Sequence, residues 1–379
     1  MSIMFKRELT EIILQSFKDG FITIVYGARR VGKTVLLEQL RASLHRPDTV
    51  IFNGDTAETI QALSSTSEIQ LSSLVKNYGV IFVDEAERIP NISLALKIII
   101  DKFPEKKIVV TGSSSLQLSR GPQENLTGRN QTFALFPLSS REILGEEPPF
   151  KASAFLETQL VFGGYPLVHT LAGNDERKRY LTGVVDDYLL RDVLFLERLE
   201  HPENLKRLAT LLAFQIGQEV SQNELANSLN ISVKTVARYL DLLEKSFIVF
   251  RVDAYSRNMR KEVGKSKKYY FYDLGIRNAL ITQFQSLSER VDVGALWENF
   301  LFVERKKKHE YARRAVTMHF WRNYAGAEID LVEITDGTLS AFECKWSPAA
   351  NVRTPKAFKE QYRTEAAVIH RENYLDFVL

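Results

Sequence analysis

Apolar residues in the amino-terminal third of the chain follow two different spacings, and together they predict an α/β domain. Residues 21–26, 80–83 and 107–111 are continuous runs rich in apolar and β-branched side chains, a pattern typical of strands buried on both faces of a parallel sheet. Between these runs apolar side chains recur at helical spacing, as at Leu36 and Leu40. We therefore expect strands and helices to alternate around a parallel sheet.

The loop after the first strand reads GARRVGKT, residues 27–34, and matches G-x-x-x-x-G-K-[ST]. Two glycines permit a tight arch whose backbone amides, at a helix amino terminus, face a polyphosphate. Lys33 would reach the β- and γ-phosphates of ATP, and the Thr34 hydroxyl would bind Mg²⁺. The alternative is a strand-to-helix turn with an accidental lysine. The candidate nucleotide-binding residues are Gly27, Ala28, Arg29, Arg30, Val31, Gly32, Lys33, Thr34 and Val35.

A second apolar run, VIFVDE at residues 80–85, ends in two carboxylates. Ligands of parallel sheets collect at the carboxyl ends of the strands, so these acids are expected beside the phosphate loop. Asp84 would hold Mg²⁺, directly or through water, while Glu85 would orient or deprotonate the attacking water.

Further polar residues follow the run at 107–111. A hydroxyl of Thr111 or Ser113 would sense the γ-phosphate, or the serines that follow would only cap a helix. Arg129 is a candidate catalytic arginine for the γ-phosphate of this subunit or of a neighbour, and its alternative is a solvated surface residue.

Composition narrows the class of protein without identifying a partner. The 379 residues include 50 basic and 47 acidic side chains, a net charge of +3 that is too close to balance to indicate nucleic acid by itself. The single cysteine, Cys344, excludes a disulfide framework and a cysteine-rich zinc site. We see no apolar run of about 18 residues and no secretion leader, so we expect a cytoplasmic protein without a membrane span.

Residues 205–275 predict a winged helix-turn-helix. Ser221 and Glu224 form a capping box, Ser232 caps a second helix, and strand-like runs follow at 247–252 and 268–273. The expected buried stripe of the second helix consists of Val233, Val236, Leu240, Leu243 and Phe247.

This winged helix predicts DNA as a partner. Between Arg251 and Lys268 there are seven basic and two acidic residues, so the hairpin would follow phosphates while the second helix enters a major groove. The alternative is a winged helix that contacts protein. The candidate DNA contacts are Lys234, Thr235, Arg238, Tyr239, Arg257, Arg260, Lys261, Lys265, Lys267 and Lys268.

The segment 319–347 alternates like strands around Asp336-Gly337, a two-residue hairpin turn. In that register Asp330 faces Glu343, and two like charges across a ladder suggest a bridging Mg²⁺ or Mn²⁺. With Lys345 on the same face, and Glu298 on the preceding helix, the spacing resembles the active site of restriction-endonuclease-like nucleases. The alternative is a nuclease-like fold that binds without cleaving.

The motifs GARRVGKT, VIFVDE, VVTGSSS, LTGR and FPLSSRE together resemble archaeal and bacterial ATPases of the AAA superfamily that carry a carboxyl-terminal domain of unknown function. The resemblance extends through nearly the whole chain. It implies an ATPase core in which Lys33, Thr34, Asp84 and Glu85 have the roles given above.

The sequence therefore predicts four parts: a P-loop ATPase core (1–140), a helical lid or static connector (141–204), a winged helix-turn-helix (205–280) and an α/β restriction-endonuclease-like domain (281–379). The predicted function is Mg²⁺-dependent ATP hydrolysis acting on DNA, with or without cleavage at the carboxyl-terminal site. The alternative is a nucleotide-gated switch that binds DNA or a protein and cleaves nothing. The sequence does not decide whether the protein forms an oligomer.

Overall fold

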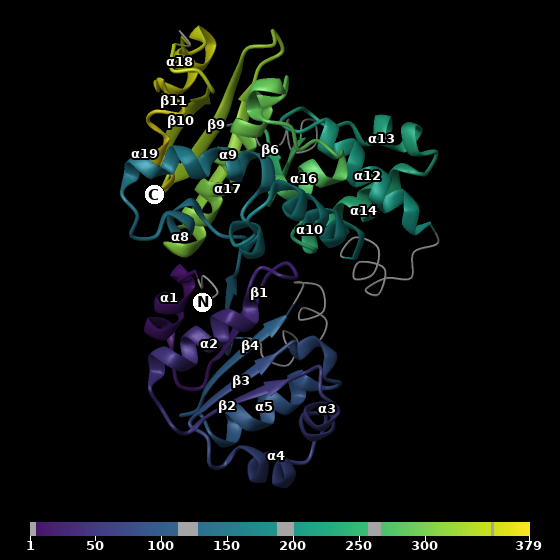
Figure 1. Cartoon of the computed structure of the whole chain (residues 1–379), viewed down its shortest axis with the longest axis vertical. Helices are drawn as coiled ribbons and strands as arrows, with labels where there is room; N and C mark the ends of the chain where they lie inside the picture. Colours follow the sequence, from purple (N-terminus) through teal and green to yellow (C-terminus); the bar gives the residue numbers. More distant parts are fainter. Residues whose placement is uncertain (1–4, 113–127, 188–200, 257–266, 350–351) are drawn as a thin grey trace. The chain divides into compact units, whose positions relative to one another are not determined.

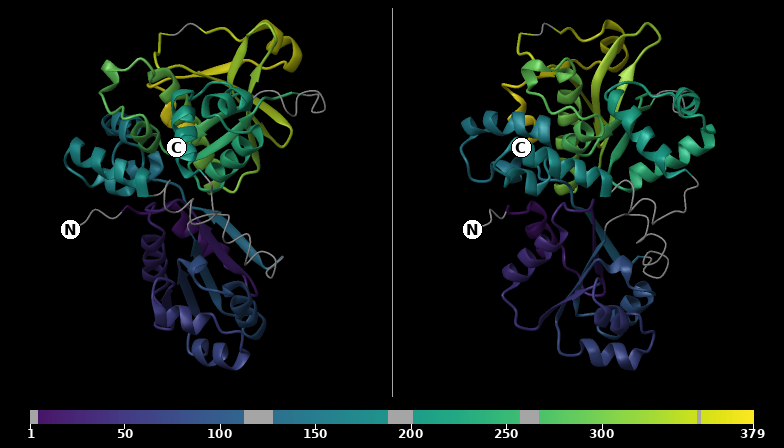
Figure 2. Two further views of the ribbon diagram at one scale, coloured as in Figure 1. Left: turned by 90° about the vertical axis from the view of Figure 1, so that its right-hand side faces the viewer. Right: turned by 45° about the vertical axis from the view of Figure 1, so that its right-hand side comes forward.

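The structure is a computed structural model that describes residues 5–112, 128–187, 201–256, 267–349 and 352–379. The chain forms two compact units (Figure 1). Both can be followed from two further sides in Figure 2. The first unit contains residues 1–136 with 245–247, and the second contains residues 137–244 with 248–379.

The first unit is built on a parallel sheet with the strand order β2-β3-β4-β1-β5 among the described residues. Every residue of β1 and β3 is buried, as the continuous apolar runs predict. The expected parallel α/β fold is thereby confirmed. The strands are β1 (Ile22–Tyr26), β2 (Thr49–Asn53), β3 (Val80–Asp84), β4 (Lys107–Gly112) and β5 (Asn130–Ala134).

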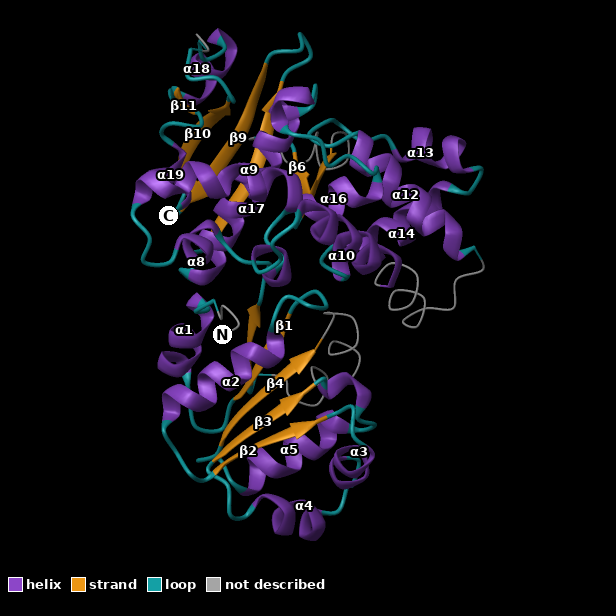
Figure 3. Ribbon diagram, in the orientation of Figure 1, coloured by secondary structure: helices purple, strands orange, loops and turns teal. Residues whose placement is uncertain are grey.

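Helices cover both faces of this sheet. Alternate strand residues such as Ile24 and Ile81 pack against α3, α4 and α5, and this layer forms the main core of the unit. Helices α1 and α2 lie over the opposite face (Figure 3). The helices are α1 (Glu8–Ser16), α2 (Lys33–Leu44), α3 (Ala57–Leu63), α4 (Glu68–Val75), the short 3₁₀ helix η1 (Ala86–Arg88) and α5 (Ile92–Lys102).

The first half of the second unit is helical. A capping box at Ser139 and Glu142 begins its first helix. Asp273 is buried and caps α16, and it also accepts the amide of Gly164 at 2.7 Å. The helices are α8 (Ser140–Leu144), η2 (Pro149–Lys151), α9 (Ala152–Phe162), η3 (Pro166–His169), α10 (Asn174–Asp187), α12 (Pro202–Phe214), α13 (Gln222–Leu229), α14 (Val233–Lys245) and α16 (Leu274–Leu280).

Two antiparallel strands, β6 (Val249–Asp253) and β7 (Lys267–Phe271), follow the pair α13 and α14. Ser221 caps α13 by accepting from the Glu224 amide, which is one of the two hydrogen bonds of the predicted capping box. The predicted apolar stripe is partly wrong, because Val233 is 40% exposed. The first turn of α14 therefore packs less closely than its sequence spacing suggests.

A mixed sheet with the order β11-β10-β9-β8 forms the carboxyl-terminal part of the described second unit. Thr335 pairs with Thr338 around the predicted turn, and Asp336 and Gly337 both have positive φ, at 49° and 77°. The hairpin prediction is confirmed. The elements are η5 (Leu287–Glu289), α17 (Val293–Tyr311), β8 (Val316–Arg322), β9 (Glu328–Thr335), β10 (Thr338–Cys344), α18 (Lys356–Tyr362), β11 (Ala366–Ile369) and α19 (Tyr374–Val378).

No helix in the described ranges is long and apolar enough to cross a bilayer.

Candidate functional site

The loop between β1 and α2 forms an arch that requires a residue without a side chain at one position and left-handed backbone conformations at two others. Arg30 and Gly32 have φ values of 62° and 97°, in the left-handed region. A Cβ added to Gly27 would lie 2.3 Å from the carbonyl oxygen of Leu135, so the chain passes there too closely for any side chain. The two glycines of the motif therefore have the backbone roles that the sequence predicts.

Lys33 begins α2 and is only 5% exposed. Its Nζ donates to the carbonyl oxygens of Gly27 and Ala28, each at 3.2 Å, and lies 4.0 Å from Glu85 Oε1. Burial lowers the pKa of Lys33, and the nearby Glu85 carboxylate opposes this shift. The ammonium group is thus held inside the arch by contacts that an anionic phosphate can replace.

Thr34 and Asp84 meet where α2 begins and β3 ends. Thr34 Oγ1 donates to Asp84 Oδ2 at 2.6 Å, and the buried Thr111 hydroxyl donates to Oδ1 of the same carboxylate. Thr111 Oγ1 also accepts from the Glu85 amide at 3.1 Å. Because β3 and β4 pair side by side, one hydroxyl at the end of β4 contacts both acidic residues, Asp84 through its carboxylate and Glu85 through its backbone amide.

Glu85 occupies a constrained position after β3. Its φ is 49°, unusual for a residue with a side chain, and its buried Oε2 has no hydrogen-bond partner. Burial raises the pKa of Glu85 to about 7, although the Lys33 ammonium acts in the opposite direction. Backbone strain and a perturbed carboxyl group in one place are typical of a functional position.

These residues fit a nucleoside triphosphate with Mg²⁺. The arch and Lys33 supply donors for phosphate oxygens, and the Thr34 hydroxyl and Asp84 carboxylate are hard oxygen ligands of the kind that Mg²⁺ prefers. Glu85 adds a carboxyl group whose oxygen Oε2 is not engaged in a hydrogen bond. Each of these groups is therefore suited to the role that the sequence predicts for it.

Arg129 lies at the opposite end of the sheet. It precedes β5, its carbonyl accepts from the amide of Ile22 at the start of β1, and its side chain pairs with Asp101. The phosphate loop follows the other end of β1, so Arg129 does not reach a phosphate bound to the same chain. That part of the prediction is wrong, and a role in a neighbouring subunit stays a prediction. Ser113 lies outside the described residues.

Two of the predicted DNA contacts are buried instead. Tyr239 is 3% exposed, is one of the buried residues of α14, and donates from its hydroxyl to the carbonyl of His201. Lys268 is 3% exposed and pairs with Glu298 and Glu328. Neither side chain is available to a phosphate.

The remaining predicted DNA contacts fall into two groups. Lys234 and Arg238 are exposed on α14, Thr235 shares a hydrogen bond with Ser232, and Lys267 is partly exposed on β7. The others lie outside the described residues: Arg257, Arg260, Lys261 and Lys265.

The predicted nuclease residues of the hairpin do come together, around a lysine. The pairing of Phe342 with Leu331 places Asp330 and Glu343 next along the ladder. Lys345 Nζ lies 2.7 Å from Asp330 Oδ2 and 2.8 Å from Glu343 Oε2. Burial raises the pKa of Glu343 to about 7, with Asp330 adding to the shift. The like charges are bridged by an ammonium group, where the sequence suggests a metal ion.

Glu298 takes part in a different ion pair. Its Oε1 accepts from Lys268 at 3.2 Å and from the hydroxyl of Tyr270. Burial raises the pKa of Glu298, and Lys268 opposes the shift. Across the described ranges no group of three or more His, Cys, Asp or Glu residues is arranged to hold a metal ion.

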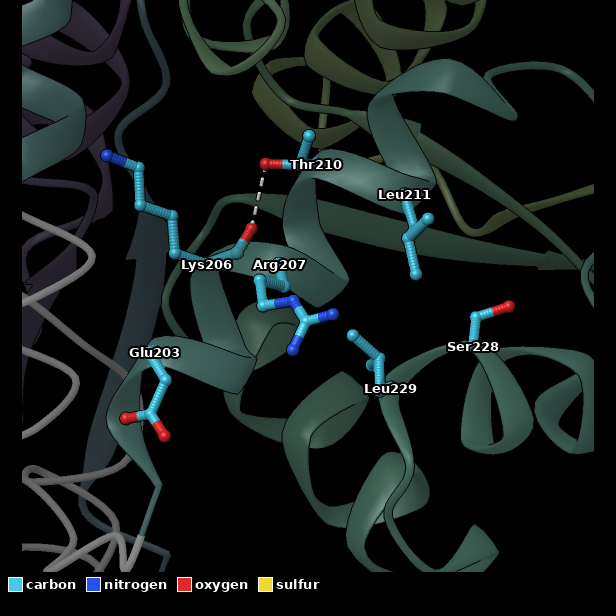
Figure 4. A pocket seen from close by; sticks show the side chains of 7 residues that line it. All are labelled: Glu203, Lys206, Arg207, Thr210, Leu211, Ser228 and Leu229. Carbon is cyan, nitrogen blue, oxygen red and sulfur yellow. Dashed lines mark hydrogen bonds between the residues drawn. The ribbon is translucent and has the colours of Figure 1, made fainter.

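The sequence also gave no signal for two features. Arg7 contacts the phosphate loop from outside the motif. A groove of about 530 Å³ lies between α12 and α13, where Arg207 and Leu229 face each other (Figure 4). This groove contains none of the residues that the motifs identify.

Three family models match parts of this chain. Residues 19–144 match a model described as an AAA domain. Two further models, both described as domains of unknown function, match residues 154–287 and 293–376. The first match supports an AAA-superfamily P-loop ATPase in the amino-terminal unit and the binding of ATP there.

Similar curated proteins are uncharacterized. One from Mycobacterium tuberculosis is 27% identical over 343 residues, which cover 90% of this chain and 74% of that protein. One from Haemophilus influenzae is 27% identical, with 77% of this chain and 76% of that protein covered. One from Methanocaldococcus jannaschii is 26% identical, with 76% and 67% covered. These relatives extend the similarity over both units.

Solved structures are only distantly similar. A signal transduction ATPase with numerous domains and a tetratricopeptide repeat sensor, from Pyrococcus horikoshii, has a TM-score of 0.33 and 12% identity, with 81% of this chain and 46% of that chain covered. A Drosophila origin recognition complex structure with GC-rich DNA and Cdc6 has a TM-score of 0.25 and 10% identity, with 69% and 86% covered. Both scores are too low to establish a shared fold.

Proposed function

We propose that the amino-terminal unit binds ATP with Mg²⁺ and hydrolyses it. The observation that carries this proposal is the meeting of Lys33, Thr34, Asp84 and Glu85 at one edge of the sheet. Each residue has a chemical property that the reaction requires, and the match of residues 19–144 to an AAA domain supports the same conclusion.

The chain's own residues act by binding, orienting and moving a proton. The loop amides and Lys33 bind and orient the phosphates. Thr34 and Asp84 would hold Mg²⁺, which when bound neutralises charge that develops on the phosphate oxygens. Glu85 orients a water molecule toward the γ-phosphate and accepts its proton, and the raised pKa of this carboxyl group, about 7, suits a base near neutral pH.

The direct test measures ATP binding and phosphate release for wild type and Lys33→Ala. We expect wild type to release phosphate with Mg²⁺ and the variant to lose ATP affinity and turnover together. Lys97→Ala, a change in α5 outside the motif, is the control and should behave like wild type. Phosphate release by Lys33→Ala at the wild-type rate would refute the proposal.

A second proposal concerns the second unit. We propose that it binds DNA without cleaving it, through a winged helix-turn-helix made by α13, α14 and the strands β6 and β7. The exposed basic residues Lys234 and Arg238 on α14 favour this arrangement. The cleaving version is the weaker alternative, because Lys345 Nζ lies between Asp330 and Glu343 and these two acids do not form a metal-binding group of three or more His, Cys, Asp or Glu residues in the described ranges.

One paired assay separates these versions. Binding and cleavage of linear, supercoiled and single-stranded DNA are measured with Mg²⁺ or Mn²⁺ for wild type, Asp330→Ala and the double variant Lys234→Ala/Arg238→Ala. Non-nucleolytic binding predicts salt-dependent affinity, a loss of affinity in the double variant and no cleavage. Metal-dependent cleavage that Asp330→Ala abolishes would establish the nuclease instead. Salt-insensitive binding to a protein, with none to DNA, would refute the DNA proposal.

A further inference from the structure

Arg7 is a buried cation outside every motif of the sequence. It immediately precedes α1 and is 2% exposed, although its guanidinium group carries a permanent charge. Nη1 donates to the carbonyl oxygen of Val31 at 2.5 Å, and Nη2 donates to that of Phe136 at 2.6 Å. One planar group therefore joins the phosphate loop to the segment that follows β5.

Helix α2 fixes the backbone on either side of Arg7. Gln39 of α2 accepts from the backbone amide of Arg7 and from the hydroxyl of Thr10, each at 3.0 Å. The same Gln39 side chain donates to the carbonyl of Phe5 at 2.7 Å. Because α2 begins with the phosphate-binding lysine, Arg7 and the loop are built on a common support.

The segment after β5 lies along the loop at both of its ends. At the start of the loop, the amide of Leu135 donates to the carbonyl of Tyr26 at 2.6 Å, and Gly27 leaves no room for a Cβ beside Leu135. At the end of the loop, Arg7 connects Val31 to Phe136. Phe136 is also the last residue of the first unit before the second begins at Pro137.

We propose that Arg7 is a positioning residue for the nucleotide reaction. It holds the Val31 end of the phosphate loop and makes the mobility of residues 135–136 depend on nucleotide binding. Because Phe136 is followed by the first residue of the second unit, nucleotide binding would then change the mobility of the chain where the two units join. This inference rests on the ATP binding proposed above. A lysine in place of Arg7 keeps the charge but has one nitrogen where arginine has two, Nη1 and Nη2, each of which holds one of the two carbonyls.

The experiment compares the whole chain as wild type, Arg7→Lys and Lys6→Ala, the last a neighbouring exposed cation that pairs with Glu11 at the surface. ATP affinity, kcat, KM and the melting temperature are measured. Amide hydrogen exchange is followed with and without ATP and Mg²⁺ in two peptides, one containing residues 27–34 and one containing residues 130–139. Exchange reports local opening in each segment separately.

We expect ATP to slow exchange in both peptides of wild type and of Lys6→Ala. In Arg7→Lys, ATP should still slow exchange in the loop peptide but no longer in the peptide 130–139. We expect kcat/KM to fall about tenfold, the usual effect of losing a charge-assisted hydrogen bond. A melting temperature close to that of wild type would show that the loss is not general unfolding.

Two outcomes overturn the inference and are distinguishable. If Arg7→Lys keeps nucleotide-dependent protection of residues 130–139 and wild-type kcat/KM, Arg7 is not a positioning residue, while the proposed ATPase stands. Arg7 is likewise not a positioning residue if Arg7→Lys loses protection of residues 130–139 together with a lowered melting temperature, and a stabilising solute restores both. If wild type itself neither binds nor hydrolyses ATP, the proposed function fails and the inference fails with it.

Discussion

Thr34 Oγ1 donates a hydrogen bond of 2.6 Å to Asp84 Oδ2, so the first turn of α2 and the end of β3 meet at one pair of oxygen atoms. The second oxygen of the same carboxylate accepts from Thr111. This leaves Asp84 oriented from both sides. A carboxylate held in this way loses little conformational freedom when it binds a metal ion, directly or through water.

This relationship predicts the behaviour of Asp84→Asn. The amide keeps the shape of the side chain but removes the charge, so the Mg²⁺ concentration needed for half-maximal turnover should rise roughly 10- to 100-fold. Phosphate release measured against Mg²⁺ concentration checks this. Asp101→Asn, a change at the opposite end of the sheet, is the control. An unchanged Mg²⁺ dependence in Asp84→Asn would remove Asp84 from the metal site.

Glu85→Gln should separate binding from hydrolysis. The amide cannot accept the proton of water, so kcat should fall about 10²- to 10⁴-fold while ATP affinity changes little. Because the carboxyl group is already largely buried, the neutral variant should be at least as stable as wild type. Binding of ATP by calorimetry and single-turnover phosphate release are the measurements. Glu58→Gln, on α3, serves as the control and should keep the wild-type kcat. A wild-type kcat in Glu85→Gln would exclude Glu85 as the base.

The features that the sequence predicts correctly are those with local rules. The phosphate loop depends on a fixed spacing of glycines before a helix, and the hairpin register depends on the Asp336-Gly337 turn, which sets every pair beyond it. Both rules operate between residues close in the chain. The predicted pairing of Asp330 with Glu343 could therefore be counted from the turn alone.

The features that the sequence misses depend on distant partners. Lys268 belongs to a basic stretch, yet it is buried and pairs with Glu298 and Glu328. Both acids are at least 30 residues away in the chain, so the sequence around Lys268 does not indicate these pairs. Tyr239 falls beside the apolar stripe of α14, but a wide stripe can include its ring while its hydroxyl reaches His201. Arg7 is recognisable only from the carbonyls of Val31 and Phe136.

His169 should make the second unit less stable in acid. It contacts the carbonyl of Gly163 at 3.0 Å, and burial lowers its pKa to about 4 from the usual 6.5. Between these values the unfolded chain binds more protons than the folded one, so the stability is present above pH 6.5 and is lost as the pH falls toward 4. At pH 5 the loss from this residue is about 2 kcal/mol.

The measurement is urea unfolding of wild type and His169→Gln at pH 5 and pH 7.5. Glutamine can still donate to the Gly163 carbonyl but does not titrate, so the variant should lose less stability between the two pH values. His45→Gln, at an exposed position directly after α2, is the control and should lose as much stability between the two pH values as wild type does. If wild type and His169→Gln lost the same stability between the two pH values, His169 would have the same pKa in the folded and the unfolded chain.

Lys268→Met should destabilise the second unit strongly. Lys268 Nζ lies 3.2 Å from Glu298 Oε1 and also pairs with Glu328. Its removal leaves the largely buried Glu298 carboxylate without its cation, whereas the more exposed Glu328 still pairs with Arg322. The expected loss is about 3–5 kcal/mol of the free energy of unfolding, measured by urea denaturation. Lys267→Met, at the adjacent and more exposed position, should change stability by less than about 0.5 kcal/mol.

A second variant tests the cause of that loss. Adding Glu298→Gln to Lys268→Met removes the carboxylate charge that has lost its cation, so part of the lost stability should return if charge burial is responsible. If packing of the lysine stem is responsible instead, the added change should bring no recovery. Equal stability of Lys268→Met and Lys267→Met would mean that the ion pairs of Lys268 contribute nothing to the free energy of unfolding.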